Sequence, residues 1–114
     1  MKQFTISERI VGDIVFLDLT GDLIFGEANK ALRGTIRDLI DMGKVKIVLN
    51  LRDVAYLDSS GIGELISALT AINREEDGRL RILNPSDRIQ YLFTISKLED
   101  IFDIDYDANL AAAV

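Results

Sequence analysis

Cysteine and histidine are both absent from this chain of 114 residues. Without cysteine the protein forms neither a disulfide nor a reactive thiolate. Without histidine it lacks the commonest zinc ligand and the commonest general base. A Ser-His-Asp hydrolase is therefore excluded within the chain, and we expect neither a metal nor a cofactor.

Long apolar runs are missing as well. The N-terminus, MKQFTISERI, lacks the continuous apolar core of a signal peptide. No window approaches the ~18 uninterrupted apolar residues that a membrane span requires. We therefore expect a cytoplasmic protein that has no membrane segment.

Basic charge is in the minority, with 13 Lys and Arg against 19 Asp and Glu and a net charge of -6. A surface of this sign gains no affinity from the phosphates of nucleic acid or of anionic lipid. The expected partners are therefore proteins, particularly proteins with basic patches. The densest basic group, Arg79 and Arg81, lies in an alternating pattern that predicts an exposed strand face.

Length and composition indicate a single domain over residues 1–114. A hydrophobic content of 48% is typical of a globular protein that buries a core. The chain contains no internal repeat, long linker or low-complexity tract.

The first half of the chain alternates strand and helix patterns. Alternating residues on both sides of the GD at 12–13 predict a β-hairpin, and the TGD at 20–22 is expected to break its second strand. Residues 27–42 show the three-and-four spacing of an amphipathic helix, and Gly43 is a typical C-terminal stop. The apolar run KIVLNL at 46–51 predicts a central strand covered on both faces.

The second half repeats this alternation. After the connector RDVAYLDSS, a second helix is expected from about Gly61 to Asn73, and RLRIL at 79–83 predicts a further strand. Asn84 and Pro85 predict a third helix, with the asparagine as its cap and the proline at its first position.

The last residues predict a short edge strand and a helical end. IFDIDYD alternates apolar and acidic residues, and ANLAAAV, at 108–114, is expected to form a frayed helix. The order of elements predicts an α/β fold whose mixed β-sheet starts with an N-terminal antiparallel hairpin and continues with parallel strands, with about four helices. Its functional loops are expected at the carboxyl ends of the strands.

The DSSG sequence at 58–61 lies where the central strand gives way to the second helix. Asp58, Ser59 or Ser60 could each cap that helix. A cap explains one polar residue, however, and three occur in a row, followed by Gly61 and Gly63, which each cost a helix about 1 kcal/mol relative to alanine.

The start of a helix also stabilises an anion, by about 0.3–1 kcal/mol. A phosphorylated serine would bring a charge of about -1.5 to -2 to this position. Capping and phosphorylation are therefore both open interpretations of DSSG.

The TGDL that starts at Thr20, the LNL around Asn50 and the DSSGIG block resemble the STAS domain family, in particular the single-domain anti-sigma factor antagonists. The resemblance spans nearly the whole chain. It implies a non-enzymatic bacterial regulator that, when unmodified, binds an anti-sigma factor with serine kinase activity and so frees a sigma factor. Phosphorylation would release the kinase until a PP2C-type phosphatase restores the unmodified form.

The same resemblance assigns roles to single residues. The serine directly after the motif's aspartate is the phosphorylation site, which is Ser59 here. Gly61 and Gly63, which carry no side chain, would keep the loop open. The expected partner-binding residues are Asp22, Asp58, Ser60, Gly61, Ile62 and Gly63, although Asp22 also fits a turn. The kinase would supply nucleotide and magnesium, and the chain is expected to be a monomer or a weak dimer.

One loop departs from the family pattern. Members often carry an aspartate after the GxL of the earlier strand-to-helix loop, whereas this chain has Ile24 and Phe25 there. We expect Phe25 to be a core or staple residue. The departure leaves the particular partner open.

Three other functions fit parts of the sequence. A STAS domain could instead be a scaffold or accessory subunit, for example of a stressosome or a lipid-transport ATPase, with no phosphorylation switch. Ser59 or Ser60 could be a catalytic nucleophile, but the usual base is missing. The GIG at 61–63 could bind a nucleotide, but it lacks the lysine and the spacing of a P-loop.

Overall fold

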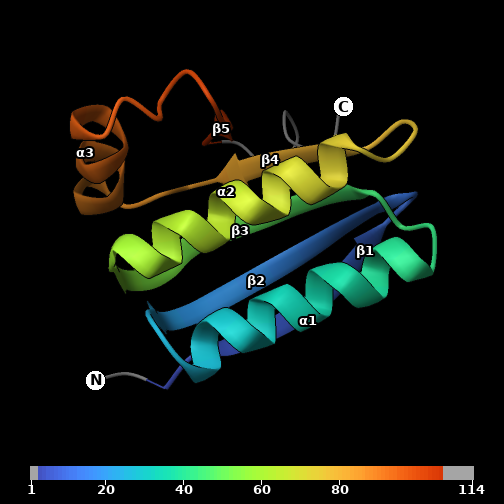
Figure 1. Ribbon diagram of the computed structural model, residues 1–114, viewed down its shortest axis with the longest axis horizontal. Helices are drawn as coiled ribbons and strands as arrows, with labels where there is room; N and C mark the ends of the chain where they lie inside the picture. Colours follow the sequence, from blue (N-terminus) through green and yellow to red (C-terminus); the bar gives the residue numbers. More distant parts are fainter. Residues whose placement is uncertain (1–2, 107–114) are drawn as a thin grey trace.

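The computed structural model describes residues 3–106, and a five-stranded mixed sheet forms its centre (Figure 1). The strands lie in the order β1-β2-β3-β4-β5. Their bounds are Thr5–Val11 (β1), Ile14–Leu23 (β2), Lys46–Leu57 (β3), Arg79–Leu83 (β4) and Asp103–Asp105 (β5). Strands β1 and β2 pair antiparallel, and every later neighbour pairs parallel, which confirms the predicted mixed sheet.

Two long helices lie side by side along the sheet (Figure 1). They are α1, Glu27–Asp41, and α2, Ser59–Asn73, and the shorter α3, Asp87–Ile95, follows β4. The helix expected at 108–114 lies outside the described residues, so residues 3–106 contain three helices. In this part of the chain, none of the helices is both long enough and apolar enough to cross a membrane.

The central strand β3 contributes to a core on each of its faces, as its apolar run predicts. Leu49 is fully buried in the main core, together with Leu32 of α1 and Leu65 of α2. Val48, the neighbouring residue in β3, belongs to a second cluster with Phe16. Because successive side chains of a strand point to opposite faces, a run without alternation indicates a strand buried on both.

Strands β2 and β3 are both longer than the sequence predicts. The TGD at 20–22 does not break β2, which runs on to Leu23, and β3 continues past Leu51 to Leu57. The two extensions pair with each other, with Leu23 opposite Leu57, through register shifts around residues 18–22. Pairing between distant segments therefore overrides the local turn signal.

The start of α3 also differs from the prediction. Its N-cap is Ser86, whose hydroxyl accepts a hydrogen bond from the Ile89 N–H at 3.3 Å, rather than Asn84. Asn84 has a positive φ of 52°. Its N–H donates to the Asp105 carbonyl at 2.8 Å, so the residue continues the link between β4 and β5. The helix therefore begins after Pro85.

Of the two arginines of β4, Arg79 is exposed as predicted and Arg81 is not. Arg81 donates from Nε to an Asp105 carboxylate oxygen at 2.7 Å, and only 19% of its side chain is exposed. Arg79 lies 3.9 Å from the Asp103 carboxylate. Strand β5 thus provides a carboxylate for each arginine, in a close contact for Arg81 and in a looser, exposed one for Arg79.

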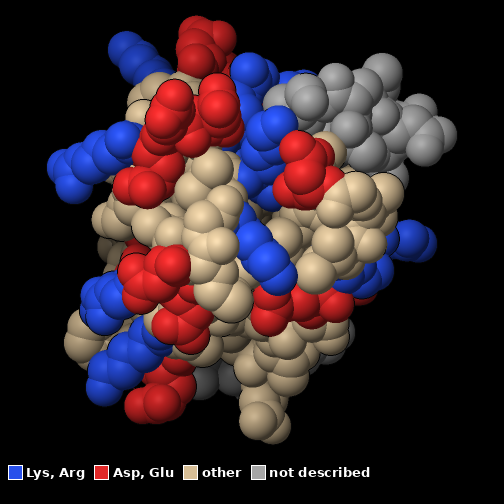
Figure 2. Space-filling view, turned by 90° about the vertical axis from the view of Figure 1, so that its right-hand side faces the viewer, with Lys and Arg blue, Asp and Glu red and all other residues tan. Residues whose placement is uncertain are grey.

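Acidic and basic side chains are interspersed at the end of the molecule where α1 ends (Figure 2). Blue and red groups alternate across this view, with uncharged residues between them. The face therefore offers no continuous basic surface to a polyanion.

Candidate functional site

Helix α2 starts directly after β3, and Asp58 is its N-cap. Its backbone is extended, and its Oδ1 accepts a hydrogen bond from the Gly61 N–H at 2.8 Å. This bond satisfies one of the amides that a helix start leaves unpaired. Of the three polar residues that the sequence offers as caps, the aspartate is therefore the one that caps.

The Asp58 carboxylate also joins two loops. The Ser60 hydroxyl donates to its Oδ1 at 2.6 Å, and the Phe25 N–H, in the connection between β2 and α1, donates to its Oδ2 at 3.0 Å. One side chain thus fixes the carboxyl ends of β2 and β3 relative to each other.

These bonds decide the protonation of Asp58. Burial, the largest single influence, raises the pKa of its carboxyl, but hydrogen bonds from Ser60, Phe25 and Gly61 together outweigh it, so the pKa is below its ordinary value. Asp58 is therefore ionised at neutral pH. A carboxylate whose pKa is lowered is a weak base, which argues against its activating a serine.

Ser60 is held from two sides. Its hydroxyl donates to Asp58 and accepts from Asn29 Nδ2 at 2.9 Å. Asn29, on α1, is only 5% exposed, and its buried Oδ1 has no hydrogen-bond partner among residues 3–106. The sequence reasoning missed Asn29, whose signal is a polar residue beside the apolar stripe that begins with Ala28.

Ser59, the first residue of α2, is exposed. Within the described part of the chain its hydroxyl makes no hydrogen bond, in contrast to that of Ser60. The two adjacent serines therefore differ: one hydroxyl is bound into the structure and the other faces solvent.

The two glycines lie inside α2 rather than in a loop, and they differ in surroundings. Gly61 is buried, and a Cβ added to it would lie 2.1 Å from the carbonyl oxygen of Leu23. Gly63 is exposed, and a Cβ there would meet nothing within 4 Å. Between them, Ile62 is partly buried against the main core. Gly61 thus permits the close approach of α2 to the end of β2.

Phe25 is not a core or staple residue, because 83% of it is exposed. It precedes Gly26, whose φ of 110° turns the chain into α1, and the buried face of α1 begins only at Ala28. Asp22 is half-buried in β2, opposite Tyr56 of β3, which is itself 41% exposed. The structure therefore brings Asp22, Phe25, Asp58 and Ser59 to the same edge of the sheet.

Within residues 3–106, no three acidic side chains converge to form a metal site. The edge thus presents a free hydroxyl, an exposed aromatic ring and a helix start.

Known proteins resemble the chain in sequence and fold. The anti-sigma-B factor antagonist of Staphylococcus aureus is 41% identical over 63 residues, which are 55% of this chain and 57% of that protein. That of Staphylococcus epidermidis is 38% identical over 63 residues. The chain thus matches little more than half the length of these curated relatives.

Solved structures share the fold at lower identity. A candidate anti-sigma factor antagonist from Thermotoga maritima superposes with a TM-score of 0.85 at 24% identity, covering 96% of this chain and 93% of that one. The phosphorylated form of SpoIIAA, a Bacillus cell fate determinant, gives 0.72 at 23% identity, covering 97% and 98%. The STAS domain family model matches residues 5–113, so the chain belongs to the STAS domain family.

Proposed function

We propose that the chain is an anti-sigma factor antagonist switched by phosphorylation of Ser59. The unmodified domain binds an anti-sigma factor that is also a serine kinase, and so frees a sigma factor. The phosphorylated domain is released, and a PP2C-type phosphatase restores it. The chain itself acts by binding, in the cytoplasm where sigma factors work, and catalyses nothing.

The similar proteins support this proposal. The staphylococcal relatives bear the name anti-sigma-B factor antagonist. SpoIIAA, which shares the fold, has been solved in an unphosphorylated and in a phosphorylated form. A STAS domain that accepts a phosphate is therefore compatible with this architecture.

The observation that carries the proposal is the difference between the two serines. Ser60 is held by Asp58 and Asn29, at 2.6 and 2.9 Å, whereas Ser59 is exposed at the first position of α2. An incoming kinase can reach the Ser59 hydroxyl without breaking a hydrogen bond. The amides and the dipole of the helix start offset part of the charge of a phosphate.

The partner surface in this proposal surrounds Ser59. It comprises Asp22, Asp58, Ser60, Ile62 and Gly63, together with the exposed ring of Phe25, whereas Gly61 is buried and contributes only to the packing beneath this surface. Exposed aromatic side chains often supply much of the binding energy of an interface. A phosphate on Ser59 would place about -1.5 to -2 charges in the middle of this surface.

Phosphate transfer tests the proposal. The purified chain is incubated with ATP, Mg²⁺ and an anti-sigma factor kinase from the same genome, and its peptides are analysed by mass spectrometry. We expect one phosphate, on Ser59, none in Ser59→Ala, and still one phosphate, on Ser59, in the matched variant Ser60→Ala.

Binding tests the switch itself. We expect Ser59→Asp to weaken kinase binding at least about tenfold, or ~1.4 kcal/mol, with little change in melting temperature because the side chain is exposed. Equal affinities for wild type and Ser59→Asp, together with an unlabelled Ser59, would contradict the proposal. That result would favour a STAS scaffold or accessory subunit of another assembly.

A further inference from the structure

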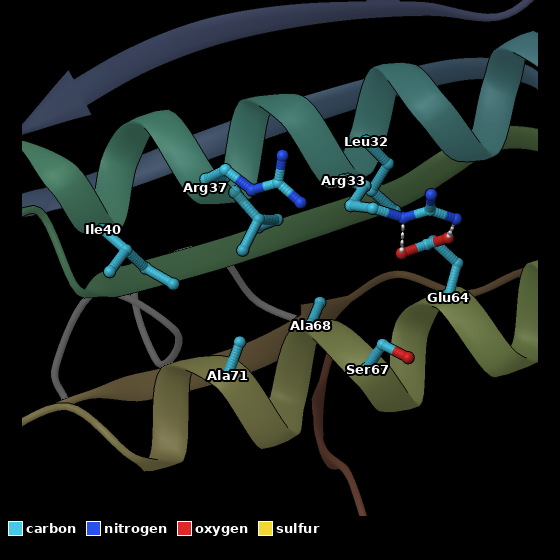
Figure 3. A pocket seen from close by; sticks show the side chains of 9 residues that line it. Leu32, Arg33, Arg37, Ile40, Glu64, Ser67, Ala68 and Ala71 are labelled. Carbon is cyan, nitrogen blue, oxygen red and sulfur yellow. Dashed lines mark hydrogen bonds and ion pairs between the residues drawn. The ribbon is translucent and has the colours of Figure 1, made fainter.

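A groove runs between α1 and α2, on the outer side of the helix layer (Figure 3). Its volume is about 470 Å³, within the range of ~300–1,000 Å³ that is usual for small-molecule sites. Its floor is formed by the buried side chains of Leu32, Ile36 and Ala68. The groove is therefore apolar at its base.

The groove exists because the facing side chains of the two helices differ in size. Helix α1 lines the groove with Ile36 and, one turn later, Ile40. Helix α2 lines it with Ala68 and Ala71 (Figure 3). Both helices are held on the sheet by fully buried leucines such as Leu65. They do not close over the alanines, and the space between them stays open.

An ion pair spans the groove near the start of α2. Arg33 donates from Nη2 to Glu64 Oε1 at 2.7 Å, and from Nε to Oε2 at 3.4 Å (Figure 3). Only 8% of the Glu64 side chain is exposed, against 55% of that of Arg33. The pair therefore bridges the two helices across the groove at this end, and the two charges offset each other.

Beyond this ion pair the groove carries one positive charge. Arg37 lies one turn after Arg33, and within the described ranges no carboxylate lies within ion-pair distance of its guanidinium. The opposite wall offers Ser67 and Ala71, which carry no charge (Figure 3). A cation at the rim of an apolar groove is complementary to an anion attached to an apolar chain.

We propose that this groove binds a small carboxylic acid with a short apolar chain. Arg37 holds the carboxylate, with the Ser67 hydroxyl within the same lining, and the chain lies against Ile36, Ile40 and Ala71. This site is distinct from the surface around Ser59 and does not depend on the function proposed for that surface.

The length of the open groove favours a small acid over a helix of another protein. From Ile36 to Ile40 the groove extends one turn, about 6 Å at 1.5 Å per residue. A docked helix with anchors at i, i+4 and i+7 needs about 10 Å, and the Arg33 and Glu64 pair stands in its way. An extended chain of about six carbons fits the available length.

The test is a titration of the ¹⁵N-labelled chain with sodium hexanoate at constant ionic strength, followed by ¹H–¹⁵N NMR. We expect saturable shifts at the amides of the groove, with a dissociation constant in the millimolar range. Hexanol, which has the same chain length without the charge, should bind at least about tenfold more weakly.

Variants locate the site. Arg37→Gln should weaken hexanoate binding at least about tenfold and leave hexanol binding unchanged, whereas Arg52→Gln, the same change at an exposed position outside the groove, should have no effect. Ala71→Leu, which fills the groove, should weaken both ligands. The spectrum of each variant reports at once whether it is folded.

The proposal would be overturned if binding of hexanoate did not saturate by about 10 mM, or if saturating shifts were confined to other parts of the chain. Equal binding of hexanol, or unchanged binding by Arg37→Gln, would also overturn it. Shifts of the groove amides that grow with protein concentration, in the absence of hexanoate, would assign the groove to a second copy of the chain and likewise overturn it.

Discussion

At the scale of single residues, the glycines of DSSGIG show how the environment decides the role of a residue. Gly61 and Gly63 are two positions apart in the same helix, and each lacks a side chain. The Leu23 carbonyl occupies the space next to Gly61, whereas the space next to Gly63 is open. Gly61 is thus required for the close packing of α2 against the end of β2, whereas Gly63 has no neighbour that a side chain would displace.

We expect opposite effects from alanine at these two positions. Gly61→Ala should destabilise the protein by about 1–3 kcal/mol, because the added methyl overlaps backbone that must move. Gly63→Ala should stabilise it by up to about 1 kcal/mol, since alanine is the better helix former. Urea unfolding measures both, and equal effects would contradict the close packing at Gly61.

The neighbouring serines show the same principle. Ser59 and Ser60 are adjacent residues of the same type, but Ser60 faces Asp58 and Asn29, whereas Ser59 faces solvent. The spacing of residues along a helix separates their directions by about 100° per residue. Within the described residues, only one of the two adjacent hydroxyls is therefore free of hydrogen bonds.

At the scale of elements, the ends of helices and strands are where the sequence misleads. Asn84 and Pro85 have the composition of a helix start, but Asn84 is bound to β5 and the helix begins two residues after Pro85. The backbone of Asn84, with its φ of 52°, is one that asparagine and glycine tolerate better than other residues. The residue serves the end of a strand rather than a helix.

The cap of α3 can be tested by substitution. Ser86→Ala should destabilise the protein by about 0.5–1 kcal/mol, because the Ile89 N–H loses its acceptor. Asn84→Gly, the control, should change stability by less than about 0.5 kcal/mol, because glycine adopts a positive φ without strain. Thermal melting followed by circular dichroism distinguishes the two, and a neutral Ser86→Ala would contradict its capping role.

At the scale of the whole molecule, acidic side chains tie the strands and helices together. Asp18 of β2 accepts hydrogen bonds from Arg9 of β1 and from Asn50 of β3, the latter at 2.8 Å. The hydrogen bond from Arg9 lowers the pKa of Asp18 more than burial raises it. Lys46 likewise lowers the pKa of Asp13, chiefly through its hydrogen bond, and Asp58 is shifted in the same direction.

Acid should therefore unfold the protein. A carboxyl whose pKa is lower in the folded than in the unfolded state contributes stability above its unfolded pKa of about 4, and loses that contribution as the pH falls through the folded value. We expect the melting temperature to be nearly constant from about pH 5 to 7 and to fall below about pH 4. Thermal melting followed by circular dichroism from pH 2 to 7 measures this decline in melting temperature.

The Asp18→Asn variant provides the control. It keeps the shape of the side chain but removes the titrating group, so its melting temperature at pH 7 should be lower and its decline in acid less steep. A decline as steep as that of the wild type would exclude Asp18 as a source of the acid sensitivity.

Much of the fold could be predicted from local patterns. The helix at 27–42 was expected within one residue of α1, and the strand at 79–83 matches β4, because the periodicity of buried residues is a property of consecutive positions. The extensions of β2 and β3 could not be predicted in this way. Leu23 and Leu57 become neighbours only when the strands pair, and their separation in the sequence hides that contact.

The candidate site likewise combines features that the sequence predicts with features that it does not. The DSSG sequence predicts the junction between a strand and a helix, and the two serines at that junction. This is possible because charge, size and capping preference are properties of the residue types themselves. The tertiary structure decided which hydroxyl is free, brought Asn29 and Phe25 to the same edge, and opened a groove beside Arg37. These are relations between residues about 30 or more positions apart, and only packing of the helices on the sheet sets their distances.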